Sequence, residues 1–69
     1  MINIDDLYLA FRDRHADYRR SPTNMSRVAL NSARMAMQTH PNYDANREID
    51  MVREADQLLN AENWARSLQ

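Results

Sequence analysis

Cysteine, glycine and lysine are absent from this sequence of 69 residues, and proline occurs only twice. The absence of cysteine excludes disulfides and thiolate metal ligands. The absence of glycine excludes the Asn-Gly and Asp-Gly turns that tight β-hairpins favour, and also the glycine-rich loops that cradle phosphates. No segment alternates β-branched and polar residues either. Together these absences argue against a β fold and a nucleotide-binding loop, and they favour an all-α protein.

Long apolar runs are absent as well, since none approaches the ~20 residues of a transmembrane helix. The acidic N-terminal segment does not resemble a signal peptide, so we expect a cytoplasmic protein without a membrane partner.

The net charge of −1 gives no whole-chain attraction to nucleic acid. Residues 1–40 hold six arginines and four acids, whereas residues 41–69 hold three arginines and six acids. These two parts are expected to attract each other, within one chain or between two.

The length suits a single domain spanning residues 1–69. A domain this short buries only ~60% of the surface that its unfolded chain exposes, so it is marginally stable alone. Because disulfides are excluded, tight helix packing or self-association must stabilise it. We expect a helical homodimer, since two-fold symmetric dimers are the commonest oligomers.

Apolar residues recur at helical spacing in three segments. The first covers about residues 4–19, and its apolar stripe consists of Ile4, Leu7, Tyr8, Phe11, His15 and Tyr18. The second covers about residues 22–38, with Ser21 as the expected N-cap and Pro22 as the first helical residue. It ends before Pro41, because the residue before a proline avoids the α conformation.

A third helix is expected over residues 44–59, with Asp44 as its N-cap. The apolar phase fails near the end of this segment, so that Trp64 projects from the polar side of a straight continuation. We expect a kink at Asn60 followed by a short turn or helix over residues 61–68, and a continuous helix with an exposed Trp64 is the alternative. The short connections make sequential helices antiparallel neighbours, in a three-helix bundle or an open helical array.

The middle helix has one narrow polar arc, which consists of Asn24, Arg27, Asn31, Arg34 and Gln38. The rest, roughly 220° of its circumference, is apolar or small, against the ~100° stripe of an ordinary surface helix. Such a helix is covered on most sides. Either the first and third helices flank it in a monomer, or part of the arc meets a second chain, which is a copy or a target. Its small residues permit close approach of another helix.

Five residues are candidates for protein binding. Met25, Met35 and Met37 lie on the broad arc, and methionine is over-used at adaptable binding surfaces, although it also fills gaps in cores. Trp64 and Tyr43 are candidate aromatic anchors, because such residues are enriched at binding hot spots. The alternatives are that Trp64 plugs the core and that Tyr43 packs as a staple before the third helix.

The polar arc supports a different hypothesis, which is nucleic-acid binding. Arginine, asparagine and glutamine make phosphate and base-edge contacts, and groups before a helix lie where phosphates bind. The candidate residues are Arg19, Arg20, Arg27, Asn31, Arg34 and Gln38. Because the domain is not basic, we expect its partner to be a protein in preference to a nucleic acid.

No catalytic or metal-binding pattern is present. There is no cysteine nucleophile and no serine in a glycine-rich elbow. The two histidines, His15 and His40, do not have the spacing of metal ligands. We therefore expect no cofactor, no metal and no small-molecule substrate, and hence a protein that is not an enzyme.

The sequence thus predicts a small non-enzymatic factor that binds another protein through helical faces. Because every basic residue except the histidines is an arginine, the composition indicates a high-GC bacterium or a phage, and we predict an accessory or inhibitory protein acting on a host protein. One alternative is a DNA-binding transcriptional regulator that uses the helix over residues 22–38. Another is a structural subunit of a larger assembly.

Overall fold

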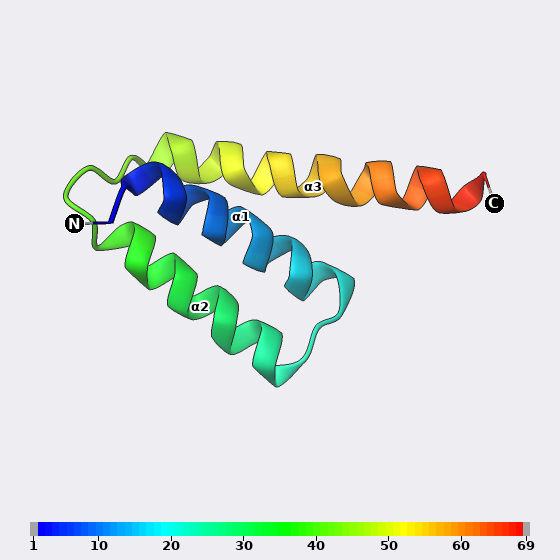
Figure 1. The fold of residues 1–69 in the computed structure, drawn as a ribbon, viewed down its shortest axis with the longest axis horizontal. Coiled ribbons are helices and arrows are strands. Elements are labelled where there is room, and N and C mark those ends of the chain that lie inside the picture. The colour runs from blue at the N-terminus through cyan, green and yellow to red at the C-terminus, as the bar shows by residue number, and fades with distance from the viewer. Residues whose placement is uncertain (1, 69) are drawn as a thin grey trace.

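The structure is a computed structural model that describes residues 2–68. It consists of three helices, α1 (Ile4–Arg20), α2 (Asn24–Gln38) and α3 (Ala45–Ser67), and no strand occurs within the described range (Figure 1). The prediction of an all-α fold is confirmed, and the arrangement is compatible with a three-helix bundle. No helix between residues 2 and 68 is long and apolar enough to span a bilayer.

Helix α1 begins and ends close to the predicted residues. Asn3 is its N-cap, and the Asn3 side chain accepts a hydrogen bond of 2.9 Å from the backbone N–H of Asp5. Two acids lie in the first turn and two arginines in the last. This order of charges matches the helix dipole, which is positive at the N-terminus and negative at the C-terminus.

Helix α2 begins later than predicted, so the assignment of Ser21 as N-cap and Pro22 as first helical residue is wrong. The N-cap is Thr23, whose hydroxyl accepts a hydrogen bond of 3.1 Å from the N–H of Ser26. The Ser26 hydroxyl in turn accepts one of 2.9 Å from the N–H of Thr23. This reciprocal capping box pairs the N–H groups of Thr23 and Ser26, which lie among those that the first turn of a helix beginning at Asn24 leaves without a backbone partner.

Helix α3 begins after the predicted N-cap Asp44 but runs without a break through Asn60 to Ser67. The predicted kink at Asn60 is therefore wrong, and the alternative of a continuous helix is the one observed. Neither glycine nor proline follows Asn60, and the alanines and Glu62 beyond it favour a helix. Trp64 is 68% exposed as a consequence.

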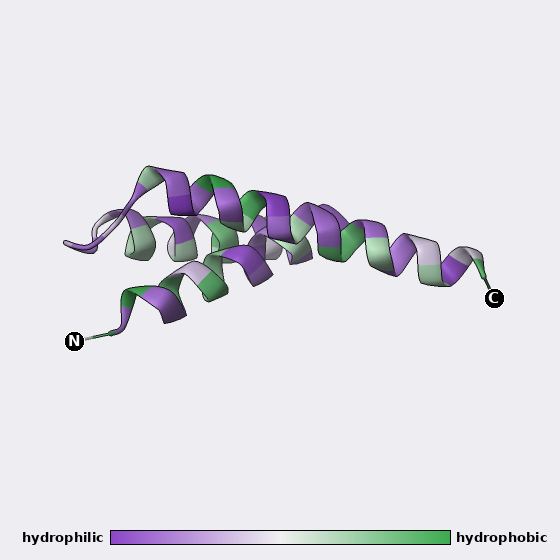
Figure 2. Cartoon of the chain, turned by 90° about the horizontal axis from the view of Figure 1, so that it is seen from above, coloured by the Kyte–Doolittle hydropathy of each residue, from purple (hydrophilic) through white to green (hydrophobic). Residues whose placement is uncertain are grey.

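The central helix is α1, and not α2 as one of the sequence interpretations required. Between residues 2 and 68, α1 packs closely against both α2 and α3, whereas the backbones of α2 and α3 stay apart, although the side chains of Gln38 and Glu48 link these two helices. Helix α2 runs antiparallel to α1, while α3 runs parallel to it on the other side (Figure 1). The outward half of α2 is consequently left without a neighbouring helix. The last turns of α3 also extend alone past the other helices in both views (Figures 1 and 2).

The core lies where the three helices converge. Five buried side chains form it, and they come from all three helices: Tyr8, Phe11, Leu30, Met37 and Met51. The Tyr8 hydroxyl accepts a hydrogen bond of 2.7 Å from the N–H of Asp44 and donates one of 3.3 Å to its carbonyl. These hydrogen bonds hold the start of α3 against α1, next to the core.

Ion pairs join the basic and acidic parts of the chain along the contact between α1 and α3. Arg12 lies 3.7 Å from Glu54, Arg19 pairs with Asp56, and Arg20 donates two hydrogen bonds of 2.8 and 2.6 Å to Glu62. The last of these raises the pKa of Arg20 and lowers the pKa of Glu62, because each charge stabilises the other. The attraction expected from the uneven charges therefore operates within the chain.

Candidate protein-docking face

Helix α2 is apolar on two opposite faces. Leu30 and Met37, exposed by 6% and 0%, turn toward the core. Met25, Val28 and Met35 are exposed by 84%, 57% and 66%. These three residues are separated by three and seven positions, which places them on one side of a helix. We call the surface that they form, together with Ala29, Ser32 and Ala36, the outer face.

The outer face and its edges carry no charge. Its members are apolar or small, and the polar residues nearest to it are Asn24 and Asn31. Arg27 and Arg34 lie about 100° and 120° round the helix from Val28. Helix α2 contains no acidic residue. The outer face is therefore an uncharged apolar strip along the whole helix.

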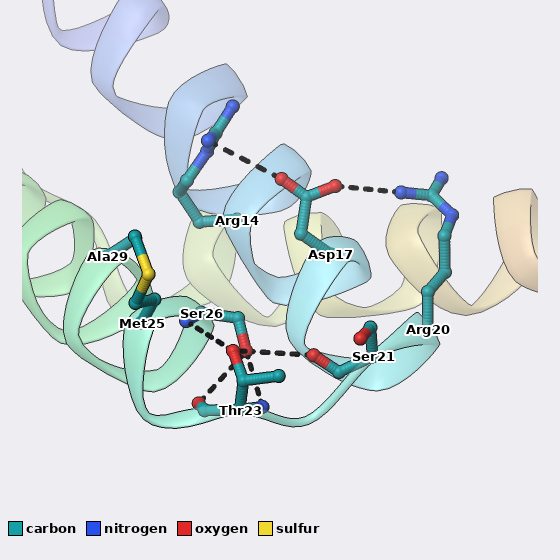
Figure 3. Close-up of a pocket in the computed structure, with 8 residues that line it drawn as sticks. All are labelled: Arg14, Asp17, Arg20, Ser21, Thr23, Met25, Ser26 and Ala29. Carbon is teal, nitrogen blue, oxygen red and sulfur yellow. Dashed lines mark hydrogen bonds and ion pairs between the residues drawn. The ribbon is translucent and has the colours of Figure 1, made fainter.

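An open groove of about 450 Å³ adjoins the outer face between the end of α1 and the start of α2 (Figure 3). Met25 and Ala29 line this groove and also the apolar hollow beside Val28. On the α1 side, Asp17 pairs with Arg14 at 3.4 Å and with Arg20 at 2.9 Å. Because these charges are already paired, the groove extends the outer face without adding a strong site for a charged ligand.

The structure separates the five residues predicted to bind protein. Met25 and Met35 lie on the outer face, and Trp64 lies on the projecting end of α3. Met37 is fully buried, so its assignment to a binding surface is wrong: it fills the core on the opposite side of α2. Trp64 belongs to α3, whereas the two exposed methionines belong to α2.

Tyr43 is half-buried and packs against the core. Its hydroxyl donates a hydrogen bond of 2.8 Å to the carboxylate of Glu48, which raises the pKa of Tyr43. Gln38 donates to the same carboxylate oxygen at 2.8 Å and so connects α2 with α3. A side chain held in this way is not free to anchor a partner.

Val28 was missed among the predicted binding residues, although it lies at the centre of the outer face. The signal was present in the sequence, because Val28 follows Met25 by three positions and precedes Met35 by seven. Exposure could not be read from that spacing, since Leu30 and Met37 repeat at the same interval of seven and are buried.

Most of the residues proposed to bind nucleic acid are engaged with other groups of the chain. Arg19 and Arg20 pair with acids of α3, and the Arg34 guanidinium lies 5.8 Å from the centre of the Phe11 ring. Gln38 is bonded to Glu48. Arg27 and Asn31 alone stay exposed without such a contact among the described residues. The geometry therefore gives no specific support to DNA binding.

Between residues 2 and 68, the two ring nitrogens of half-buried His15 are the only buried side-chain nitrogen or oxygen atoms without a hydrogen bond. Its ring lies 5.9 Å from that of Phe11. Burial lowers the pKa of His15, the positive charges of Arg19 and Arg34 lower it further, and the carboxylate of Asp56 opposes them. The folded protein thus disfavours the charged form of His15.

We expect His15→Leu to raise the free energy of unfolding by about 1 kcal/mol, because it removes two unpaired buried nitrogens. The wild-type protein should lose stability as the pH falls below about 6.5, since its folded state then binds fewer protons than its unfolded state. In His15→Leu this loss should vanish. Urea unfolding between pH 8 and 5 measures both effects, with His40→Leu as the control that keeps His15. An unchanged pH dependence in His15→Leu would contradict the prediction.

No group of three or more potential metal-ligating side chains gathers within residues 2–68. Comparison with known protein families, with curated protein sequences and with solved structures finds no significant match to this chain. Within residues 2–68 the structure is an all-α arrangement of three helices, in which α1 is central and the outer face of α2 is uncovered.

Proposed function

We propose that this chain is a non-enzymatic protein-binding module and that the outer face of α2 is its docking surface. The observation that carries the proposal is the exposure of Met25, Val28 and Met35 on one side of a helix whose other side forms the core. An accessory or inhibitory role toward another protein, expected from the sequence, falls within this class.

Energetics support a polypeptide as the ligand of this surface. Fully burying a methionine or valine side chain contributes roughly 1.5–3 kcal/mol, and the three large side chains of the outer face are more than half exposed. A helix laid along α2 covers all three at once, because their spacing follows the helix axis. Such a contact is a helix–helix packing, in which side-chain ridges of one helix fit the grooves of the other.

Photocrosslinking from defined positions tests the proposal. A photoreactive amino acid replaces Met35 on the outer face or, as the matched control, exposed Arg53 on α3. In cells that express the protein, we expect a covalent adduct with a polypeptide from position 35 and not from position 53. Val28→Glu should abolish the adduct, because it places a charge at the centre of the apolar surface.

The matched variant Ile49→Glu is the control for Val28→Glu, because it puts the same charge on a helix outside the outer face. Ile49 is 50% exposed on α3, close to the 57% exposure of Val28, so both substitutions put a glutamate on a half-exposed helical site. The adduct should survive Ile49→Glu. If no adduct forms from position 35, or if Val28→Glu and Ile49→Glu reduce it equally, the outer face is not a docking surface.

A further inference from the structure

We propose that the occupant of the outer face is a second copy of this chain, with the two α2 helices antiparallel and crossing at Ser32. This inference rests on the proposed docking function and names its partner. It is carried by the absence of charge on the outer face, the order of large and small residues along it, and the surface area of the single chain.

The charge pattern favours a copy over a charged target. In a symmetric dimer residue i of one copy contacts residue j of the other and j contacts i, so a charge on this face would need an opposite charge elsewhere on the same face to pair with. The outer face has none, and the neighbouring polar residues Asn24, Asn31 and Ser32 both donate and accept hydrogen bonds. A partner with charged residues at these positions would find no opposite charge to pair with.

Large and small residues alternate along the outer face in an order that is complementary to its own reverse. An antiparallel crossing at Ser32 brings each residue against the one that lies equally far beyond Ser32. Val28 then meets Ala36, and Met35 meets Ala29, so that a large side chain faces a small one in both pairs, while Met25 falls opposite Thr39, the C-cap residue of α2. A parallel pairing would instead set Val28 on Val28 and leave the alanines facing each other across a gap. The antiparallel pairing of large with small residues therefore allows packing at the density of a protein core.

The area of the single chain points the same way. A compact monomer of 8.2 kDa exposes roughly 4,500 Å², whereas this chain exposes 5013 Å², an excess of about 500 Å² to which both the outer face and the projecting end of α3 contribute. A standard interface removes ~800 Å² from each partner. The 15 residues of α2 offer a contact about 22 Å long, which places this interface below the standard size. We therefore expect a dissociation constant of roughly 1–100 µM.

Sedimentation equilibrium over a concentration series tests the dimer. We expect the mass to rise from 8.2 kDa toward twice that value as the concentration passes through the micromolar range. Val28→Glu should weaken association at least 100-fold, while Ile49→Glu should behave as the wild type. Circular dichroism at low concentration checks that both variants keep the wild-type helix content.

Engineered disulfides test the antiparallel register, and the natural absence of cysteine makes the readout clean. Val28→Cys mixed with Ala36→Cys should form a mixed disulfide dimer under mild oxidation, faster than either variant alone. Rapid homodimeric linkage of Val28→Cys alone would overturn the antiparallel arrangement. A wild-type protein that stays at 8.2 kDa up to millimolar concentration overturns the dimer itself. If the photocrosslink at position 35 then reaches a different polypeptide, the docking function stands and only the self-association fails.

Discussion

Replacing Met37 by alanine is expected to lower the free energy of unfolding by about 2–5 kcal/mol, which is the usual cost of truncating a buried methionine. The matched substitution Met25→Ala is expected to change it by less than ~0.5 kcal/mol. Both residues are methionines of α2, but Met37 is fully buried whereas Met25 is 84% exposed. The two losses of free energy differ because Met37→Ala leaves a cavity in the core, whereas Met25→Ala leaves none.

The effect at Met37 is large relative to the whole stability of the protein. A chain of 69 residues has a total free energy of unfolding of roughly 3–10 kcal/mol, and the core formed by residues 2–68 contains five large buried side chains. We therefore expect Met37→Ala to be partly or fully unfolded at 25 °C. Urea unfolding followed by circular dichroism, at concentrations low enough to keep the protein monomeric, measures both variants. Equal losses in the two variants would mean that α2 does not turn the Met37 side to the core.

The second large effect is expected at Ala55, which is 0% exposed at the contact of α3 with α1. Its neighbours Glu54 and Asp56 pair with arginines of α1, which shows how closely the two helices approach here. Ala55→Leu adds three carbons where no space exists, and we expect a loss of about 1–3 kcal/mol. The added bulk should also separate the helices and break the pair between Arg19 and Asp56.

Ala65 provides the matched control for this prediction, because it is an exposed alanine of the same helix. Ala65→Leu should leave the free energy of unfolding within ~0.5 kcal/mol of the wild type. Thermal unfolding of the two variants gives the comparison. A stable Ala55→Leu variant would contradict the close packing of α1 and α3.

Much of the secondary structure could be predicted because its signals are local. The signals that start and end these helices act between groups a few residues apart in the sequence. They are the acids before and within the first turns, the cap at Asp44 and the stop before Pro41. The two errors are local as well. Ser21-Pro22 and Thr23 offer competing starts for α2, and the reciprocal bonds of Thr23 and Ser26 decide between them. At Asn60 an apolar phase change was interpreted as a break, although Ala61 and Glu62 favour continuation.

The candidate site could be predicted only in part. The sequence correctly indicated that α2 has more apolar surface than one contact needs, and Met25 and Met35 are indeed exposed. Met37 was grouped with them because methionines on one broad arc are chemically identical. Which of them is covered depends on where α1 lies, and no short-range signal specifies that position.

By itself, then, the sequence determined three amphipathic helices, their approximate ends and the excess of apolar surface on the middle one. These properties depend on hydrogen bonds and side-chain spacing within a single helix. Only the tertiary structure decided that α1 is central, that α3 runs parallel to it, and that the outer face stays uncovered. The physical reason is that helix pairing depends on contacts between residues far apart in the chain, such as Tyr8 with Asp44 and Arg20 with Glu62. Several pairings of three such helices satisfy the same pattern of polar and apolar residues, and these distant contacts select one of them.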